Sequence, residues 1–455
     1  MPPLIKRFQS CLLITSGIIM ITSSLVRADV FAIELEKALK ASDKIASAHQ
    51  SYLSAREDVA IATSGTEWSS NLVLDSKRGN KQTNGGDYAR NDSRNLTVNV
   101  KKKLYDGGVG SAQETVAIIT LDLVMQQINM TEQSVLLEAI RTYTGLAEAQ
   151  DRVAINRANV ARLKEYLKAA QLQLDIGEIT PTDFAGARAR FARANANLIQ
   201  AEAALSSQMA SYETMIGTTP SQLTLPELSF NLPQTAAAAA DRALQNHPSY
   251  RIASMQERIA RKTMDVLIAG VRPNLDLTLS GKTTDATSAQ MDAETYSATV
   301  MLTMPLFPSS SVYAKSRGAV ADHREALFSE KDTAKSTRLA AENAFRNYQS
   351  TASVIAAYEA EYEAAVIVRD GTKQEVQFGE KTFLDQLDAE QDVVTAELSL
   401  LISKHDRIDA IFSLLSAMGE LTAENLGLVG MTSPQDAAPI ESPIVAPFPI
   451  INYPE

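Results

Sequence analysis

The chain repeats itself, and several landmarks recur 202 residues apart. Gly177 and Gly379 (379 − 177 = 202) each lie six residues before an aspartate. The other pairs that keep this spacing are Tyr105 with Phe307, which close strand-like runs, and Gly217 with Gly419, which end long helical patterns. Because unrelated landmarks share one register, the sequence predicts a tandem duplication of a unit with long helices and one pair of strands. Such an elongated unit cannot bury its own apolar faces.

The N-terminus has the pattern of a secretory signal peptide. Lys6 and Arg7 precede an apolar run from Cys11 to Ile21, and small residues surround a cleavage site after Ala28. A transmembrane anchor is the alternative, but the run is short and polar residues follow it. Removal of residues 1–28 would take three basic residues, so the net charge would change from −11 to −11 − 3 = −14.

Composition excludes several classes of function. Cys11 is the single cysteine, so the mature chain would have no disulfide, thiolate metal site or cysteine nucleophile. An acidic chain is a poor partner for nucleic acid. No segment after the signal peptide is long and apolar enough to span a bilayer as a helix, so a membrane-embedded part would have to be β-structure.

Proline placement predicts very long helices. None occurs between Pro3 and Pro181 or between Pro308 and Pro434. Apolar residues then recur by sevens in both repeats, which predicts coiled-coil packing, although an ordinary helical bundle core would give the same pattern. The first set is Phe184, Phe191, Leu198, Leu205 and Tyr212, and the second is Leu387, Val394, Leu401, Ile408 and Leu415.

Each repeat also holds two runs of alternating residues, which predict a hairpin. Their polar connecting loops are expected at Gly79–Asn95 and Gly281–Glu294. A soluble hairpin packed on the helices is one interpretation. Membrane strands are the other, but four strands are too few for an outer-membrane barrel, which needs about eight or more. Three copies would supply 12 strands and would join the helices into a tube.

The predicted fold class is therefore mainly α, with two tandem repeats of long coiled-coil helices plus two strands. The trimer would form a 12-stranded β-barrel and an α-helical barrel. The predicted boundaries are residues 1–28 for the signal peptide, 29–217 and 236–428 for the repeats, 218–235 for the linker, and 429–455 for a Pro-rich disordered tail.

Across residues 30–428 the sequence resembles the TolC-like outer-membrane factors. The motifs that carry the resemblance are Ala243–Pro248, Leu104–Gly108, Leu306–Pro308 and the two turns Ile176-Gly177-Glu178 and Phe378-Gly379-Glu380. It implies a homotrimeric channel in the outer membrane of a Gram-negative bacterium, with a large periplasmic portion. The channel would be the exit duct of a tripartite efflux pump or a type I secretion system. The alternative is a soluble periplasmic coiled-coil scaffold.

The resemblance also implies partners and sites. A periplasmic adaptor and an inner-membrane ABC or proton-driven pump would dock at the two turns and open the duct. Asp385 and Asp388 share a helix face and would form acid rings at a gate, together with Lys381, Asp183 and Thr182. Thr182, Asp183 and Thr382 are expected to cap the helices that follow the turns. For the acids, the alternative is that they merely stabilise first turns.

No enzyme, cofactor or metal site is predicted. The histidines are scattered without metal-ligand spacing. The segment Gly107–Gly110 lacks the Gly-Lys-Ser/Thr ending of a phosphate loop and is interpreted as a turn. Lys101, Lys102 and Lys103 at a strand end are interpreted as a membrane-interface marker rather than a ligand site.

Overall fold

The computed structural model describes residues 21–428, apart from 83–85, 87, 91, 221–222, 224–229, 287–292 and 308. The described chain divides into two compact units. We call residues 21–48, 128–248 and 334–428 the helical unit, and residues 49–127 and 249–333 the sheet unit. Most of the predicted signal peptide and the whole predicted tail lie outside the described residues, while residues 21–28 begin helix α1 (Ile21–Ala41).

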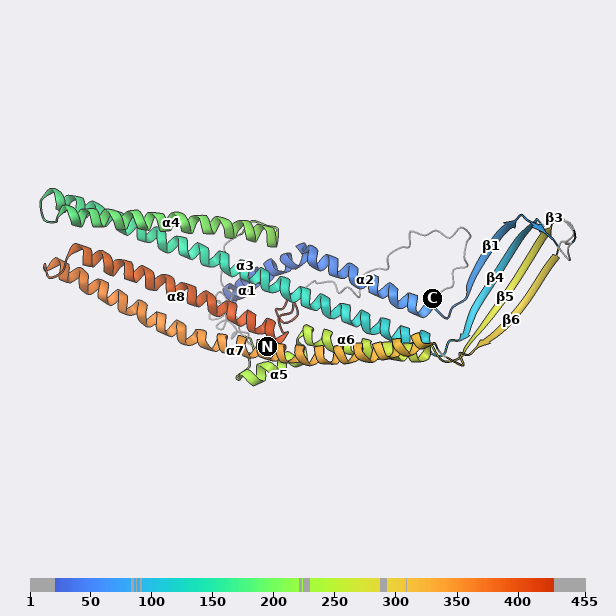
Figure 1. Cartoon of the computed structure of the whole chain (residues 1–455). Coiled ribbons are helices and arrows are strands. Elements are labelled where there is room, and N and C mark those ends of the chain that lie inside the picture. Colours follow the sequence, from blue (N-terminus) through green and yellow to red (C-terminus); the bar gives the residue numbers. More distant parts are fainter. Residues whose placement is uncertain are drawn as a thin grey trace, which may run out of the picture. The chain divides into compact units, whose positions relative to one another are not determined.

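Two helical hairpins, one from each repeat, build the helical unit (Figure 1). Their helices are α3 (Val109–Asp175), α4 (Pro181–Ile216), α7 (Ser310–Gln377) and α8 (Phe383–Met418). The predicted long helices are confirmed, since α3 and α7 run unbroken for 67 and 68 residues. At 1.5 Å per residue each is about 100 Å long. No helix in the described part of the chain has the length and apolarity needed to cross a membrane.

Residues from both repeats share one core in the helical unit. The ring of Phe31 on α1 packs edge-on against Tyr143 on α3, with centroids 5.1 Å apart, and lies 6.0 Å from Phe412 on α8. The hydroxyl of Tyr212 on α4 donates to the buried Glu34 carboxylate at 3.0 Å. Helix α5 (Ala236–Asn246) packs its alanines against the same core, so neither repeat is complete alone.

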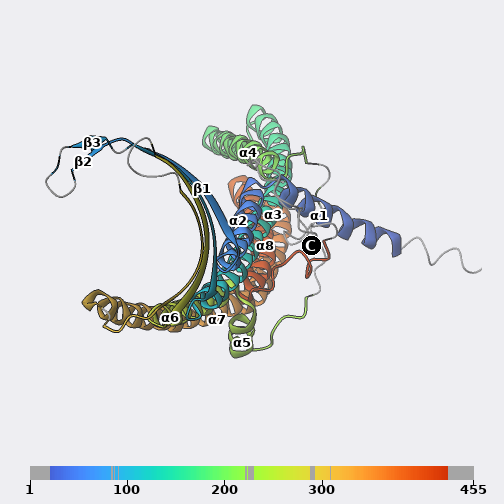
Figure 2. The ribbon, with the colours of Figure 1, turned by 90° about the vertical axis from the view of Figure 1, so that its right-hand side faces the viewer.

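The sheet unit contains one antiparallel four-stranded sheet in the order β1-β4-β5-β6, drawn as a curved ribbon in Figure 2. Its helices are α2 (Asp43–Ser64), α6 (Pro248–Ala269) and parts of α3 and α7. The strands are β1 (Ser69–Lys77), β4 (Ser93–Tyr105), β5 (Asn274–Ala286) and β6 (Ala293–Thr303), with a ribbon of β2 (Asn80–Lys81) and β3 (Ala89–Arg90). The central β4–β5 pair joins the two repeats.

The strands differ from the predicted ones at their ends. Residues 281–286, predicted as loop, belong to β5 and pair with β4 and partly with β6. Residues 93–95 and 293–294, also predicted as loop, belong to β4 and β6, and β2 and β3 lie within the predicted loop 79–95. The strand-like run closed by Phe307 was predicted to include Met304 and Leu306, but both lie beyond the end of β6. Polar composition suggested loops, but ladder hydrogen bonds from neighbouring strands keep these segments extended.

Candidate functional site

The sheet has one apolar and one polar face, because residues opposite one another across a ladder point the same way. Leu72, Val98, Gly281 and Tyr296 form one row across all four strands. The next row points to the other face and consists of Asn71, Asn99, Ser280 and Ser297. The alternation continues along the sheet, so the strand pattern predicted from the sequence is confirmed.

The apolar face is the more exposed one. Leu74 and Tyr296 are 74% and 80% exposed, whereas Asn95, Thr97 and Asn99 on the polar face are half-buried. Hydrogen bonds also run along the polar face, where the Asn95 amide donates to Asp75 at 2.7 Å and the Thr284 hydroxyl donates to Asn95 at 2.8 Å. A sheet in water buries its apolar face instead, so this arrangement suits lipid outside and water inside.

The sheet is open at both edges. Among the described residues, β1 pairs with β4 alone and β6 pairs with β5 alone. Unpaired strand edges cannot remain in lipid, because their N–H and C=O groups would have no partners there. In lipid, a sheet with these two edges would need further strands to pair with β1 and β6.

A tight junction joins β4 to α3. The carboxylate of Asp106 accepts hydrogen bonds from the Gly108 and Gly110 amides, at 2.9 and 2.6 Å. Gly107 has a φ of 72°, and a Cβ there would lie 2.6 Å from the Ala269 carbonyl oxygen. The carboxylate thus occupies the helix N-terminus that a phosphate would need. This confirms a turn at Gly107-Gly108, whereas Val109 and Gly110, also predicted as turn, already belong to α3.

The two turns of the helical unit have the same geometry. Gly177 and Gly379 adopt φ angles of 81° and 77°, as predicted for left-handed helix ends. In each turn the amide of the following glutamate donates to a carbonyl five residues back, at 2.8 Å for Glu178 and 2.9 Å for Glu380. Immediately before each glycine stands a bare apolar side chain, with Ile176 71% and Phe378 81% exposed. We call these two segments the tips.

Capping boxes begin the helix after each tip. Thr382 is the predicted N-cap of α8, and its hydroxyl and amide donate to the Asp385 carboxylate at 2.6 and 2.8 Å. In α4 the prediction for Thr182 was wrong, because Thr180 is the N-cap and pairs with Asp183. Thr182 lies one residue inside the helix, after Pro181. Proline favours the first helical position and disfavours helical geometry in the residue before it, which places the cap at Thr180.

The predicted gate residues of the second repeat each have a partner within the same chain. Thr382 hydrogen bonds hold the pKa of Asp385 below its usual range. Lys381 lies 2.8 Å from Glu375, whose hydrogen bond raises the pKa of Lys381. Asp388 reaches across to α4 instead. Asp385 and Asp388 thus lie three residues apart on α8, and each has a different partner.

Arg190 was not identified from the sequence, yet it is the partner of Asp388. Its Nη2 and Nε lie 2.6 and 3.0 Å from Asp388 Oδ1. Helix α4 can approach α8 here because residue 186, one turn earlier, is a glycine. A Cβ at this position would lie 2.7 Å from Leu384 Cδ2 on α8. Gly186 occupies the position equivalent to Asp388 in the first repeat. A glycine where the other repeat has an aspartate was the feature of the sequence that could have predicted a close approach of α4 to α8.

A second polar link joins α3 to α8 nearby. The Tyr166 hydroxyl donates to the buried Glu390 carboxylate at 2.9 Å and accepts from the Gln386 amide at 3.2 Å. Arg162 Nε lies 3.6 Å from the other Glu390 oxygen. Burial, with Glu390 as the next cause, raises the pKa of Tyr166. This network and the Arg190–Asp388 pair tie the hairpin of one repeat to that of the other.

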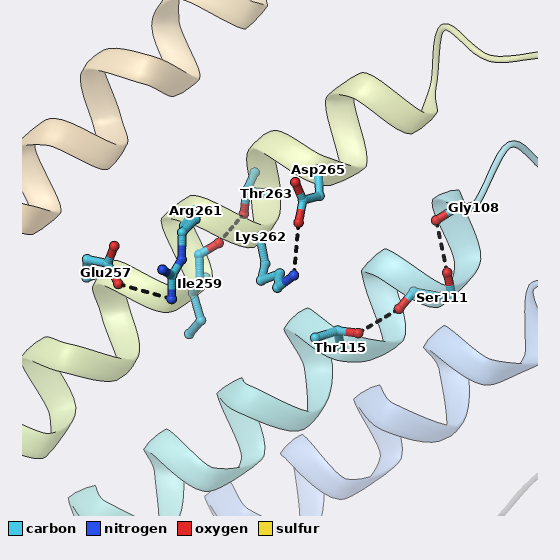
Figure 3. A network of polar contacts seen from close by, with 9 residues as sticks. All are labelled: Gly108, Ser111, Thr115, Glu257, Ile259, Arg261, Lys262, Thr263 and Asp265. Atoms are coloured by element: carbon cyan, nitrogen blue, oxygen red, sulfur yellow. Dashed lines mark hydrogen bonds and ion pairs between the residues drawn. The ribbon is translucent and has the colours of Figure 1, made fainter.

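The polar contacts at the start of α3 and along α6 are local ones. In Figure 3 each drawn contact runs within α6, within α3, or from α3 to Gly108 just before it, such as Ser111 to the Gly108 carbonyl at 3.2 Å and Lys262 to Asp265 at 3.0 Å. Within the described residues no group of three or more His, Asp or Glu side chains is placed to hold a metal ion. The candidate functional features are therefore the faces and edges of the sheet, the two tips, and the polar contacts between the two repeats.

Comparisons with known proteins agree with this emphasis. Residues 35–218 and 239–420 match the family model described as outer membrane efflux protein. The chain is 27% identical over 427 residues to the outer membrane efflux protein BepC of Brucella suis biovar 1 (strain 1330), covering 93% of this chain and 92% of BepC. It is 25% identical over 359 residues to the alkaline protease secretion protein AprF of Pseudomonas aeruginosa, covering 76% and 74%. Its fold is similar to that of the outer-membrane channel OprN, with a TM-score of 0.77, 20% identity, and coverage of 87% and 92%.

Proposed function

This chain belongs to the outer membrane efflux protein family, and from that premise we propose that three copies assemble into one channel. It is an outer-membrane exit duct for efflux or type I secretion, with a large helical portion in the periplasm. The similarity to BepC supports the efflux route, and the similarity to AprF supports the secretion route. As a channel, the protein would provide a path for its cargo and perform no chemistry on it.

The two-faced sheet with open edges is the observation that carries the proposal. Because the four strands alternate in direction, β6 of one copy can pair antiparallel with β1 of the next. Two copies would close an eight-stranded barrel, whose interior is filled by side chains. Three copies give 12 strands, an interior wide enough for water, and no free edge in the lipid.

We place the partners at the tips. Ile176 and Phe378 are exposed apolar side chains on equivalent turns, so a trimer would present six exposed apolar side chains at its tips. With Gly177, Glu178, Gly379 and Glu380 they form the surface on which a periplasmic adaptor would dock. The adaptor would connect the duct to an inner-membrane ABC or proton-driven pump, which supplies the energy for transport.

We also propose that Asp385, Asp388 and Lys381, with Asp183 and Thr182 on α4, belong to a gate near the tips. Asp183 and Asp385 lie in the first turns of α4 and α8, and Asp388 lies one turn further along α8. A threefold assembly would repeat these carboxylates around its axis. In that position they would attract cations into the closed entrance. Their contacts within one chain would then break, or exchange between copies, when the tips separate.

The assembly is tested by extraction and sizing. We expect the protein to leave membranes only with detergent and to have the mass of three copies by mass photometry. Purified protein should conduct ions in planar bilayers. Release into buffer without detergent, as a monomer without conductance, would support the soluble periplasmic scaffold and end the channel proposal.

The gate has its own test. Asp385→Asn combined with Asp388→Asn keeps side-chain volume and removes two charges per copy. We expect weaker block of the bilayer conductance by divalent cations added on the tip side. Unchanged block in a channel that conducts normally would contradict the gate assignment and leave the channel itself intact.

A further inference from the structure

Three consecutive lysines on β4 alternate between the two faces of the sheet. Lys101 lies opposite Ser69 and Thr278, in a row of the polar face. Lys102 lies opposite Leu277, in a row of the apolar face. The amino group of Lys102 is 5.1 Å from the centre of the Trp68 ring. Trp and Lys side chains of this kind are typical of the membrane–water interface.

Lys103 returns to the polar face, where it lies opposite Asp276. Lys101 and Lys103 are both exposed, and neither forms an ion pair with a described residue. Asp276 is the single acid in their two rows. Each copy therefore carries one excess positive charge at this end of the polar face. A third lysine, Lys282, follows further along the same face, opposite Thr97 and Thr295.

We propose that Lys101 and Lys103 form a basic band on the water-filled inside of the strand portion, which attracts small anions and acidic groups of passing cargo. This inference rests on the proposed three-copy channel, in which the band holds six amino groups and three carboxylates. The three neighbouring lysines then have different roles, because Lys102 faces lipid headgroups while Lys101 and Lys103 face the lumen. The whole chain is acidic, with a net charge of −11, so the band is a local reversal of charge.

Ion selectivity tests the band, and Lys102 provides a matched control. We expect Lys101→Gln with Lys103→Gln to raise the cation-to-anion permeability ratio for KCl by about twofold or more. The measurement is the reversal potential across a bilayer at low ionic strength, where charges are least screened. Lys102→Gln should leave the ratio unchanged. An unchanged ratio in the double variant, or a change with Lys102→Gln alone, would overturn the proposal.

Chemical access gives a second measurement that does not depend on selectivity. In a Cys11→Ser background, single Lys101→Cys, Lys103→Cys and Lys102→Cys channels contain one thiol per copy. A sulfonate-bearing methanethiosulfonate reagent added in the water should change the conductance of the first two channels and not of the third. Lack of effect at Lys101 and Lys103 would refute the band while the channel continued to conduct. Absence of conductance in the unsubstituted protein would instead refute the channel proposal, and the inference with it.

Discussion

The two tips share their backbone and differ in their side chains. Each ends its first helix at a left-handed glycine and begins the next with a Thr–Asp capping box, Thr180 with Asp183 and Thr382 with Asp385. The two boxes lie 202 residues apart, so duplication preserved the groups that the backbone needs. Those contacts are local, and each repeat satisfies them independently.

The side chains that face the other repeat have diverged in charge. Asp388 and Glu390 stand on α8 where the first repeat has Gly186 and Arg188. Their partners Arg190 and Arg162 both come from the first repeat. The turn geometry is therefore the same in both repeats, whereas the charge complementarity between the hairpins comes from side chains that differ between the repeats.

The largest effect is expected at the end of α8. A Cβ at Gly419 would lie 2.5 Å from the His247 Cα, whereas no atom of the described residues lies within 4 Å of a Cβ at Gly217. Both glycines have positive φ, so Gly217→Ala should cost about 1–2 kcal/mol from strain alone. Gly419→Ala should cost about 1–3 kcal/mol more through overpacking. Thermal unfolding of the detergent-solubilised protein, followed by circular dichroism, checks this order; equal shifts would contradict it.

A smaller loss is expected in the buried network. Glu390→Ala leaves the Tyr166 hydroxyl without its hydrogen-bond acceptor and Arg162 without its ion-pair partner, so the free energy of unfolding should fall by about 1–3 kcal/mol. Arg188→Ala at the equivalent exposed position should change it by less than about 0.5 kcal/mol. Denaturant unfolding of both variants provides the comparison. A stable Glu390→Ala protein would show that the network does not hold the hairpins together.

Arg190 is expected to affect the closed state more than stability. Its ion pair with Asp388 is partly exposed, so Arg190→Gln should cost at most about 1 kcal/mol. If the pair holds α4 against α8 in the closed channel, conductance of the variant should rise in bilayers. Arg193→Gln, an exposed arginine on the same helix, is the control. Equal conductance of the two variants would remove Arg190 from the gate.

The smallest effect concerns pH. Because the pKa of Asp385 is lowered in the folded chain, its contribution to stability is present above its ordinary value of 3.8. That contribution is lost as pH falls through the lowered pKa. Amide exchange in the first turn of α8 should therefore accelerate, relative to its middle, on acidification below about pH 4. Asp385→Asn should abolish this dependence, and a variant that retained it would assign the titration to another group.

Much of the fold was predictable because it depends on short-range rules. Proline-free stretches predicted α3 and α7, and the glycines predicted both turns and both later helix ends. Thr180 was missed although Pro181 marked it, because Thr182-Asp183 offered a second plausible cap. Residues 281–286 were missed because their polar composition resembles a loop, whereas pairing with β4 decides their conformation.

The sequence alone determined the two long helices, the two tips and the alternation along the strands, since neighbours along the chain decide helix length, turn geometry and alternation. The tertiary structure alone decided which charges meet. Arg190 reaches Asp388 and Tyr166 reaches Glu390 only because α3, α4 and α8 pack in one register, which no local pattern encodes. It also decided that the apolar face of the sheet is the uncovered one, because exposure depends on what the rest of the chain leaves bare.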